Sequence, residues 1–271
     1  MISKSLSERG LVILGCGKMG SALLSGWFDN GLDPKNVWVL DPRPNDWVKS
    51  LDIHLNEPLP DDPAVVLIAV KPQMMGEVLP RMQKLGDGTT LFISVAAGTS
   101  IATLEDVLGR STPIVRAMPN TPAAVGQGIT AVIGNGRART NDVEEAENLL
   151  AAVGQTVRLK NETQMDAVTG VSGSGPAYVF HMIETLAAAG VAEGLDEELA
   201  MTLAKATVAG AGALAAQSDE TPSELRVNVT SPHGTTLAGL NVLMDAKAGL
   251  GPLVEKTVKA AAGRSRELSN E

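Results

Sequence analysis

The stretch that decides the fold is LVILGCGKMG, which covers residues 11–20. Four apolar residues in succession are typical of a buried strand, and the glycine after them ends it. Residues 18–28 then carry a helical pattern that stops at Asn30 and Gly31. A strand, a glycine-rich turn and a helix in immediate succession predict the first half of a βαβ unit.

Short apolar runs recur along residues 1–160, separated by polar stretches with helical spacing. They cover residues 37–40, 64–70, 91–95 and 114–115. Continuous apolar strands that alternate with helices indicate a parallel sheet covered on both faces. The sequence therefore predicts an α/β fold with a doubly wound N-terminal domain over residues 1–160.

The remaining residues, 161–271, show no strand signal. Long Ala-, Leu-, Val- and Gly-rich patterns with helical spacing cover residues 176–191, 197–217 and 250–268. Several of these helices are apolar on more than one face, which requires burial on several sides. We expect an all-helical C-terminal domain, part of which is covered by a second subunit.

Composition limits the classes of partner. A formal net charge of -9, without a run of four basic residues, argues against nucleic-acid binding. The single Cys16 excludes an internal disulfide and a multi-cysteine metal site, and we expect no metal. The polar N-terminus lacks the features of a signal peptide, and the longest apolar run, residues 64–70, is too short for a bilayer span. We expect a cytoplasmic protein without a membrane partner.

The turn after the first strand carries chemistry. Gly15, Gly17 and Gly20 form a G-x-G-x-x-G pattern in the strand–turn–helix context that gives the pattern meaning. The first glycine permits the tight turn, the second lets the backbone approach a pyrophosphate, and the third lets helix and strand pack closely. The free N–H groups at the helix start add partial positive charge. The turn predicts a bound dinucleotide.

Two residues after the second strand bear on the choice of cofactor. Asp41 follows Gly20 at about the 20-residue distance at which an acidic side chain binds the adenosine ribose hydroxyls of NAD. Arg43 lies two residues further on and is suited to the 2′-phosphate of NADP. A solvated Asp-Pro-Arg-Pro turn is the third reading. The sequence leaves the choice between NADPH and NADH open.

The ends of two later strands complete the predicted cofactor site. In doubly wound sheets, ligands lie beyond the carboxyl ends of the strands. Residues 69–73 end the central apolar run, and Pro72 stops that strand. Residues 95–98 end the next strand with small side chains that leave room for a flat ring. Either segment is also compatible with an ordinary strand end.

Six motifs together resemble one known family. They are GCGKMG at 15–20, AVKP at 69–72, MPNTP at 118–122, DAVTG at 166–170, SGSGPAY at 172–178 and VTSPHGTT at 229–236. Their order is similar to that in pyrroline-5-carboxylate reductases, and the similarity covers nearly the whole chain. The last two motifs are specific to that family, whereas the first is shared by many dehydrogenases.

The resemblance implies a Rossmann-like domain followed by a helical dimerisation domain. It also implies reduction of 1-pyrroline-5-carboxylate to L-proline by NADPH or NADH, the last step of proline biosynthesis, in a homodimer whose subunits share the site. The residues that would face the nucleotide are Gly15, Cys16, Gly17, Lys18, Met19, Gly20, Asn56, Ala69, Val70, Lys71, Pro72, Val95, Ala96, Ala97 and Asn228. Those that would face the substrate are Glu162, Ser231, Thr235 and Thr236.

The substrate loop, residues 231–236, has chemistry that suits this assignment. A carboxylate is held by hydroxyls and by backbone N–H groups at a helix start, and the loop supplies both before a helical run from Leu237. A plain helix cap is the alternative. Because an iminium is already electrophilic, hydride transfer depends largely on positioning. Thr236 is the candidate to donate a hydrogen bond to the ring nitrogen.

One position departs from the family pattern. His233 occupies a site where the family commonly has glycine. If the backbone there has a positive φ, a histidine carries a conformational cost. Its imidazole would add positive charge near the substrate carboxylate or point into solvent.

Two competing functions remain. One is another two-domain NAD(P)-dependent imine or β-hydroxyacid reductase, which would use a lysine of the helical domain. Lys205 is the one lysine within residues 176–217. The other is a non-catalytic nucleotide-binding dimer, which would have no need of the polar loop at residues 231–236.

Overall fold

The computed structural model describes residues 3–269. It has two compact units, Met1–Gly173 with Ala261–Glu271, and Ser174–Ala260. The first unit thus takes in residues beyond 160 that pack against it. Among them are Asp166 and Ser265, whose side chains are joined by a hydrogen bond of 2.7 Å.

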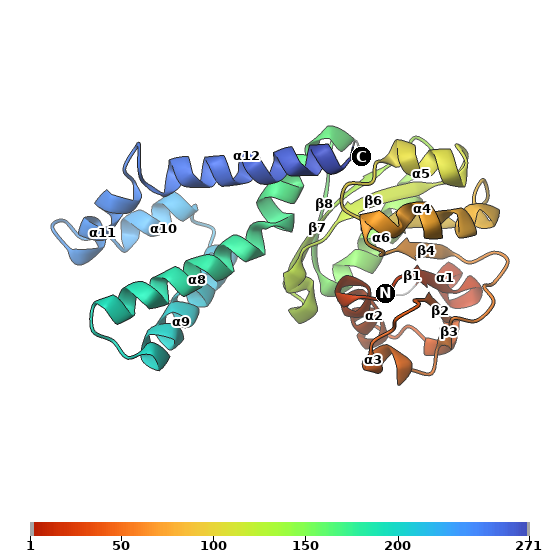
Figure 1. Ribbon diagram of the computed structural model, residues 1–271, viewed down its shortest axis with the longest axis horizontal. Coiled ribbons are helices and arrows are strands. Elements are labelled where there is room, and N and C mark those ends of the chain that lie inside the picture. Colours follow the sequence, from red (N-terminus) through yellow and green to blue (C-terminus); the bar gives the residue numbers. More distant parts are fainter. Residues whose placement is uncertain (1–2, 270–271) are drawn as a thin grey trace. The chain divides into compact units, whose positions relative to one another are not determined.

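The first unit contains an eight-stranded sheet in the order β3-β2-β1-β4-β5-β6-β7-β8 (Figure 1). The strands are β1 (Leu11–Leu14), β2 (Val37–Leu40), β3 (His54–Leu55), β4 (Val65–Ile68), β5 (Leu91–Ser94), β6 (Ile114–Met118), β7 (Gly128–Gly134) and β8 (Gly154–Arg158). Neighbours pair in parallel, except that β6 and β7 are antiparallel. The predicted parallel sheet is confirmed for β1 to β6, and the antiparallel pair is a departure from it.

Helices cover both faces of this sheet. They are α1 (Lys4–Arg9), α2 (Lys18–Asp29), α3 (Asp46–Lys49), α4 (Met75–Val78), α5 (Ile101–Leu108), α6 (Thr140–Leu150) and α7 (Met165–Val168). Alternate β1 residues enter different cores, because successive side chains of a strand point to opposite faces. Leu11 and Ile13 pack with α2 and α6, whereas Val12 and Leu14 pack with α4 and α5.

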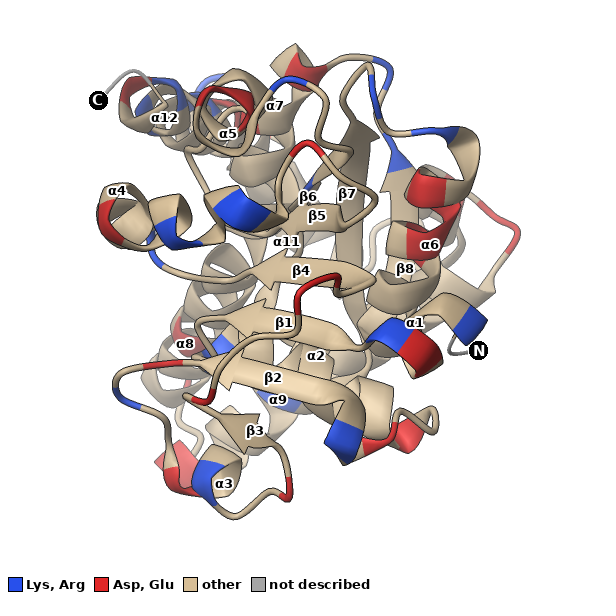
Figure 2. Cartoon of the chain, turned by 90° about the vertical axis from the view of Figure 1, so that its right-hand side faces the viewer, with Lys and Arg blue, Asp and Glu red and all other residues tan. Residues whose placement is uncertain are grey.

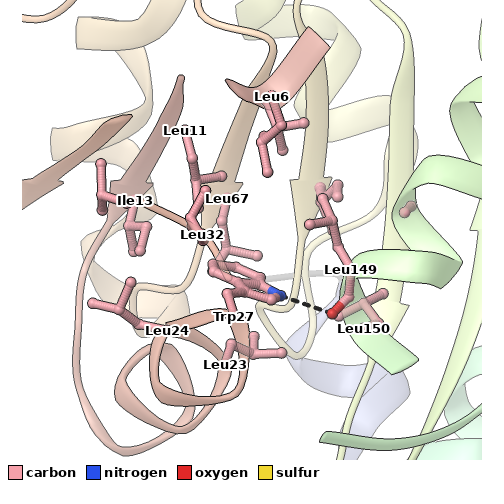
Figure 3. Packing of buried hydrophobic residues seen from close by; sticks show 14 of the residues in the cluster. Leu6, Leu11, Ile13, Leu23, Leu24, Trp27, Leu32, Leu67, Leu149 and Leu150 are labelled. Atoms are coloured by element: carbon pink, nitrogen blue, oxygen red, sulfur yellow. Dashed lines mark hydrogen bonds between the residues drawn. The ribbon is translucent and has the colours of Figure 1, made fainter. Parts of the chain in front are cut away.

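Trp27 is the largest side chain buried in the first of these cores (Figure 3). Its Nε1 donates a hydrogen bond of 2.7 Å to the carbonyl of Leu149 on α6, so the indole is buried without an unsatisfied donor. The charged residues lie mainly on helices and loops, and the central strands β1, β4 and β5 carry none (Figure 2). Near these three strands, charged side chains therefore lie beyond the strand ends.

The second unit is built from helices. They are α8 (Gly175–Ala192), α9 (Glu197–Gln217), α10 (Pro222–Asn228), α11 (Thr235–Leu243) and the first part of α12 (Leu250–Leu268). The cluster of buried residues in this unit consists of Ala187, Ala200 and Ala204. Many large apolar side chains are exposed in the single chain, among them Phe180, Leu186, Leu199, Leu203, Leu214, Val227, Val242, Leu243, Met244 and Leu253.

Helix α9 is also long and apolar enough, by length and composition alone, to cross a bilayer. That test is weak, because helices of soluble proteins pass it as well. The helix begins at an Asp196 cap that accepts a hydrogen bond of 2.9 Å from the Leu199 N–H, and its first turn carries Glu197 and Glu198. Acidic residues at a helix start complement the helix dipole.

Candidate active site

The glycine-rich turn lies between β1 and α2. Gly15 has a left-handed φ of +85°, and a Cβ there would lie 2.7 Å from Val70 Cγ1. A Cβ on Gly20 would lie 2.8 Å from the Gly15 carbonyl oxygen. Around Gly17 no heavy atom lies within 4 Å of the Cβ position, and this residue caps α2 without a side-chain hydrogen bond. The turn is closed where it packs and open where a pyrophosphate would approach, so it fits a dinucleotide.

Asp41, just after β2, is held against this turn. Its Oδ2 accepts a hydrogen bond of 2.8 Å from the Cys16 N–H, and its Oδ1 accepts one of 2.8 Å from the Arg43 N–H. The carboxylate is therefore fixed beside the glycine-rich turn, where it can also accept hydrogen bonds from the hydroxyls of a ligand. The Arg43 side chain is exposed and has no hydrogen-bond or charge partner among residues 3–269.

Asn56 supports Asp41 from behind. Its Oδ1 accepts a hydrogen bond of 3.0 Å from the Asp41 N–H, and its Nδ2 donates one of 2.9 Å to the Asp41 carbonyl. Asn56 itself has a left-handed φ of 56°, a conformation that asparagine tolerates better than most residues. The Asn56 side chain, which we predicted to face the nucleotide, is thus hydrogen-bonded to the backbone just after β2.

The ends of β1, β4 and β5 lie at one edge of the sheet. In the parallel register, Leu14 is opposite Ile68, and Ile68 is opposite Ser94. The predicted segments at 69–72 and 95–97 therefore follow neighbouring strands on the same side as the glycine turn. The strand order reverses between β1 and β4, which is where doubly wound sheets bind their ligands.

Within the turn, three predicted cofactor residues differ in their surroundings. Lys18 is exposed and Met19 is partly buried against the core. Cys16 is buried, and this burial is the main cause that raises the pKa of its thiol to about 11. A hydrogen bond with Ser21 lowers the pKa, and the charge of Asp41 raises it. The thiol is neutral at physiological pH and belongs to the hydrophobic core, so the backbone of the turn is the part of Cys16 that is available to a ligand.

Glu162 lies just before α7, in the first unit. Its Oε1 accepts a hydrogen bond of 2.8 Å from the Ile101 N–H at the start of α5 and one of 2.6 Å from Arg116 Nη1 on β6. Neither Arg116 nor Ile101 is among the residues predicted for the site. The signal for the first was present, since Arg116 is a charged residue within an apolar strand, Ile114–Met118.

The remaining predicted residues belong to the second unit. The turn at residues 231–234 is closed by a hydrogen bond of 3.1 Å from the Gly234 N–H to the Ser231 carbonyl. Helix α11 starts at Thr235, earlier than the predicted Leu237, because Gly234 is its cap, and this cap makes no side-chain hydrogen bond. Asn228 ends α10, and its Nδ2 donates a hydrogen bond of 2.6 Å to Glu220 Oε1.

The hydroxyls of the substrate loop are available to a ligand. Ser231, Thr235 and Thr236 are exposed, and their hydroxyls make no hydrogen bond within residues 3–269. The capping alternative for Thr236 is therefore not what the structure has. His233 has a φ of 61°, so the positive φ considered from the sequence is present, and its side chain is exposed.

A doubly wound sheet whose strand order reverses beside an open glycine-rich turn defines the class of Rossmann-like dinucleotide-binding proteins. Two family models match the chain. Residues 10–98 match the model of NADP oxidoreductase coenzyme F420-dependent proteins, and residues 162–268 match that of pyrroline-5-carboxylate reductase dimerisation.

Individual relatives are similar along almost the whole chain. The pyrroline-5-carboxylate reductase of Methanosarcina acetivorans is 38% identical over 95% of this chain and 97% of its own length. That of Pseudomonas aeruginosa is 37% identical over 98% and 99%. The solved structure of the Coxiella burnetii reductase is 33% identical with a TM-score of 0.89, and covers 96% of this chain and 98% of that one.

The Plasmodium falciparum pyrroline carboxylate reductase, solved with NADP bound, is 30% identical with a TM-score of 0.82, and covers 97% of this chain and 99% of that one. The chain belongs to the pyrroline-5-carboxylate reductase family. Its fold and family therefore agree with the predictions made from the sequence.

Proposed function

We propose that the protein transfers hydride from NADPH or NADH to the imine carbon of 1-pyrroline-5-carboxylate, whose ring nitrogen takes a proton before or during the transfer, giving L-proline in the last step of proline biosynthesis. The observation that carries this proposal is the 38% identity with a curated reductase of that name over 95% of the chain. The open glycine turn and the unpartnered hydroxyls of residues 231–236 support it, because the reaction needs a dinucleotide site and a carboxylate site.

Bound cofactor supplies the hydride, and the residues at the strand ends hold the cofactor in place. Gly15 to Gly20 provide the tight turn and the α2 N–H groups for the pyrophosphate. Asp41 and Arg43 receive the adenosine ribose, the former through hydroxyls and the latter through any 2′-phosphate. Residues 69–72 and 95–97 form the surface for the nicotinamide half, with Asn56 and Asn228 as further residues of the site.

The substrate carboxylate is bound by hydroxyls and by the start of α11. Ser231 and Thr235 donate hydrogen bonds, and the unsatisfied N–H groups of the helix N-terminus add partial positive charge. Thr236 donates to the ring nitrogen and so orients the imine carbon toward the cofactor. Catalysis then depends on placement of the two reactants, for which a pair of titrating side chains is not required.

The two parts of the chain have different tasks in this proposal. Residues 1–160 bind the dinucleotide, and residues 161–271 dimerise and bind the substrate. The match to a dimerisation model supports self-association, and we propose a homodimer, or an assembly of such dimers, in the cytoplasm. A mostly exposed apolar helical unit is consistent with a partner subunit covering it.

The test is to follow NADPH and NADH oxidation by the purified protein with 1-pyrroline-5-carboxylate. Acyclic imines and β-keto acids serve as competing substrates. The proposal expects turnover with the cyclic imine to exceed turnover with the others by far. Preferential turnover of another imine or of a keto acid would favour the other reductase classes. Tight NAD(P)H binding without turnover of any of them would favour a non-catalytic nucleotide-binding dimer.

A further inference from the structure

The loop between β5 and α5, residues 95–100, is held at both of its ends. The Val95 N–H donates a hydrogen bond of 3.0 Å to the Ile68 carbonyl. At the other end, Ser100 caps α5 by accepting a hydrogen bond of 3.1 Å from the Thr103 N–H. If the adenosine half of the cofactor lies at the end of β2, the nicotinamide half lies across the point of reversal, at the ends of β4 and β5. The loop then forms part of the nicotinamide surface.

Glu162 holds the start of α5 from a distant part of the chain. The Ile101 N–H is one of the first-turn donors that the helix itself leaves without a partner. It donates to Glu162 Oε1 at 2.8 Å, and the same oxygen accepts from Arg116 Nη1 at 2.6 Å. The end of the loop is therefore tethered to a carboxylate whose position is set by a side chain from β6.

The segment 162–166 also holds helix α12, which contacts the middle of the β5–α5 loop. Gly98 has a left-handed φ of +73°, and a Cβ there would lie 3.2 Å from the Cβ of Leu268 in the last turn of α12. That turn is anchored by the 2.7 Å hydrogen bond from Ser265 Oγ to Asp166 Oδ1. Glu162 and Asp166, four residues apart, thus support the loop from its end and from its middle.

Stability alone does not account for the ion pair. The Arg116 side chain is 5% exposed, and its Nε and Nη2 are buried without a hydrogen-bond partner in the described part of the chain. Replacing a buried ion pair by apolar residues is often neutral or stabilising. The Arg116–Glu162 ion pair is better explained by the fixed position that it gives to the Glu162 carboxylate.

We propose that Glu162, fixed by Arg116, is a positioning residue that holds the β5–α5 loop in the conformation that receives the nicotinamide ring. It acts on the loop through the Ile101 N–H, and this role is additional to the direct substrate contact implied by the family resemblance. The proposal rests on the proposed function in that it places the nicotinamide at this loop.

The sharpest test removes the donor and keeps both charged residues of the ion pair. Ile101 is the first residue of α5, the position at which proline is best tolerated in a helix. Ser100 has φ −77° and ψ 160°, a conformation that suits a residue before proline. Ile101→Pro therefore deletes the N–H in a backbone conformation that proline adopts, and the proline Cδ, which takes the place of the hydrogen, displaces Glu162 Oε1 from the loop. Ile101→Ala is the matched control that keeps the N–H and loses the side chain.

The measurement compares whole cofactor with its fragment. NADPH and NADH are titrated by fluorescence, and ADP-ribose and its 2′-phosphate, which lack the nicotinamide, by calorimetry. We expect Ile101→Pro to raise the Kd of the whole cofactors roughly fivefold or more, because a smaller fraction of the loop is competent to bind. The Kd of the fragments should stay unchanged, and Ile101→Ala should behave as wild type.

A second pair of variants tests the acceptor without leaving a charge unpaired. Arg116→Met with Glu162→Met removes the acceptor, whereas Arg116→Met with Glu162→Gln keeps an amide oxygen for the Ile101 N–H. We expect the first to lose cofactor affinity selectively and the second to regain most of it. Melting temperatures of all variants identify any that fail to fold.

Three results would overturn the proposal. Wild-type NAD(P)H affinity in both Ile101→Pro and the double Met variant would remove the positioning role. Equal losses for whole cofactor and fragment would mean general damage to the nucleotide site. An unchanged cofactor Kd with a raised KM for 1-pyrroline-5-carboxylate would assign Glu162 to the substrate instead. A wild-type protein that binds NAD(P)H but does not reduce the imine would refute the proposed function alone.

Discussion

The two units of this chain bury their apolar residues in different ways. In the first, the strands and helices enclose two clusters of large side chains, with Trp27 and Phe92 among those fully buried. In the second, the buried cluster is made of alanines, while Leu199 and Leu203 of α9 are 44% and 48% exposed. The first unit has its own hydrophobic core, whereas the second unit exposes apolar side chains that a second subunit would bury.

The largest expected effect follows from this difference. Leu203→Asp places a charge on the apolar face of α9, where burial between subunits would leave it unpaired at a cost of several kcal/mol. We expect loss of activity and a fall in scattering mass from at least twice 28.1 kDa toward the monomer value. The control is Val125→Asp, which changes a 74% exposed valine of the first unit and should retain mass and activity. A fully active monomer would contradict the comparison.

The next effect tests the glycine turn of the first unit. Gly17→Val places a branched side chain where nothing lies within 4 Å, so the protein should fold, with a melting temperature lowered only by the weaker helix cap that valine provides at the start of α2. It should bind NAD(P)H at least roughly tenfold more weakly, because the pyrophosphate must approach the backbone there. Gly136→Val, at an equally open glycine, is the control. Wild-type cofactor affinity in Gly17→Val would show that the turn is not the pyrophosphate site.

A smaller effect is expected for Thr236 in the second unit. Because its hydroxyl caps no helix in the structure, Thr236→Ala should melt close to wild type. Loss of a hydrogen bond worth about 1–2 kcal/mol more in the transition state predicts a roughly five- to thirtyfold fall in kcat. Thr236→Ser should recover most of the rate. Normal turnover by Thr236→Ala would end its catalytic assignment.

A smaller effect than that of Thr236→Ala is expected when Asp41 or Arg43 is replaced, and it concerns the preference between NADPH and NADH. Asp41→Ser removes a fixed negative charge from the position expected for a 2′-phosphate, and Arg43→Ala removes an exposed positive one. We expect the NADPH to NADH ratio of kcat/KM to rise about fivefold in the first variant and to fall by a similar factor in the second, since exposed charge pairs contribute up to about 1 kcal/mol. If neither ratio moves, the residues form only a surface turn.

The smallest effect concerns the backbone at His233. Its φ of 61° is disfavoured for a residue with a Cβ and is readily adopted by glycine. His233→Gly should therefore raise the free energy of unfolding by roughly 0.5–1 kcal/mol, after the greater freedom of glycine in the unfolded chain is subtracted. Denaturant unfolding measures this. Lower stability would show that the imidazole makes a stabilising contact in the assembled protein.

The sequence predicted those parts of the fold that depend on local signals. Buried runs marked β1, β2, β4, β5 and β6, because each is apolar along nearly its whole length. β7 and β8 were not predicted. The latter, Gly154–Arg158, carries Gln155, Thr156 and Arg158 and so has no continuous apolar run, whereas β7 contains the apolar run 131–133 but begins and ends with glycine and is interrupted by Thr130.

The same difference between local and long-range signals applies to the candidate site. The spacing of Gly15, Gly17 and Gly20 is local and was sufficient to place the turn. The contact between Arg116 and Glu162 joins residues 46 positions apart, and periodicity carries no information about such a pair. Asn56 was expected to face the nucleotide, but only the structure shows that its side chain is bonded to the Asp41 backbone.

The most direct test of the account is isotope transfer in a single reaction. The protein is incubated with 1-pyrroline-5-carboxylate and NADPH that carries deuterium on the transferred position of C4, in ordinary water, and the product is examined by mass spectrometry. We expect L-proline with a single deuterium at the former imine carbon. Labelled cofactor that stays unoxidised in the presence of the imine, or proline without deuterium, would contradict the central claim that this chain is an imine-reducing, NAD(P)H-dependent enzyme.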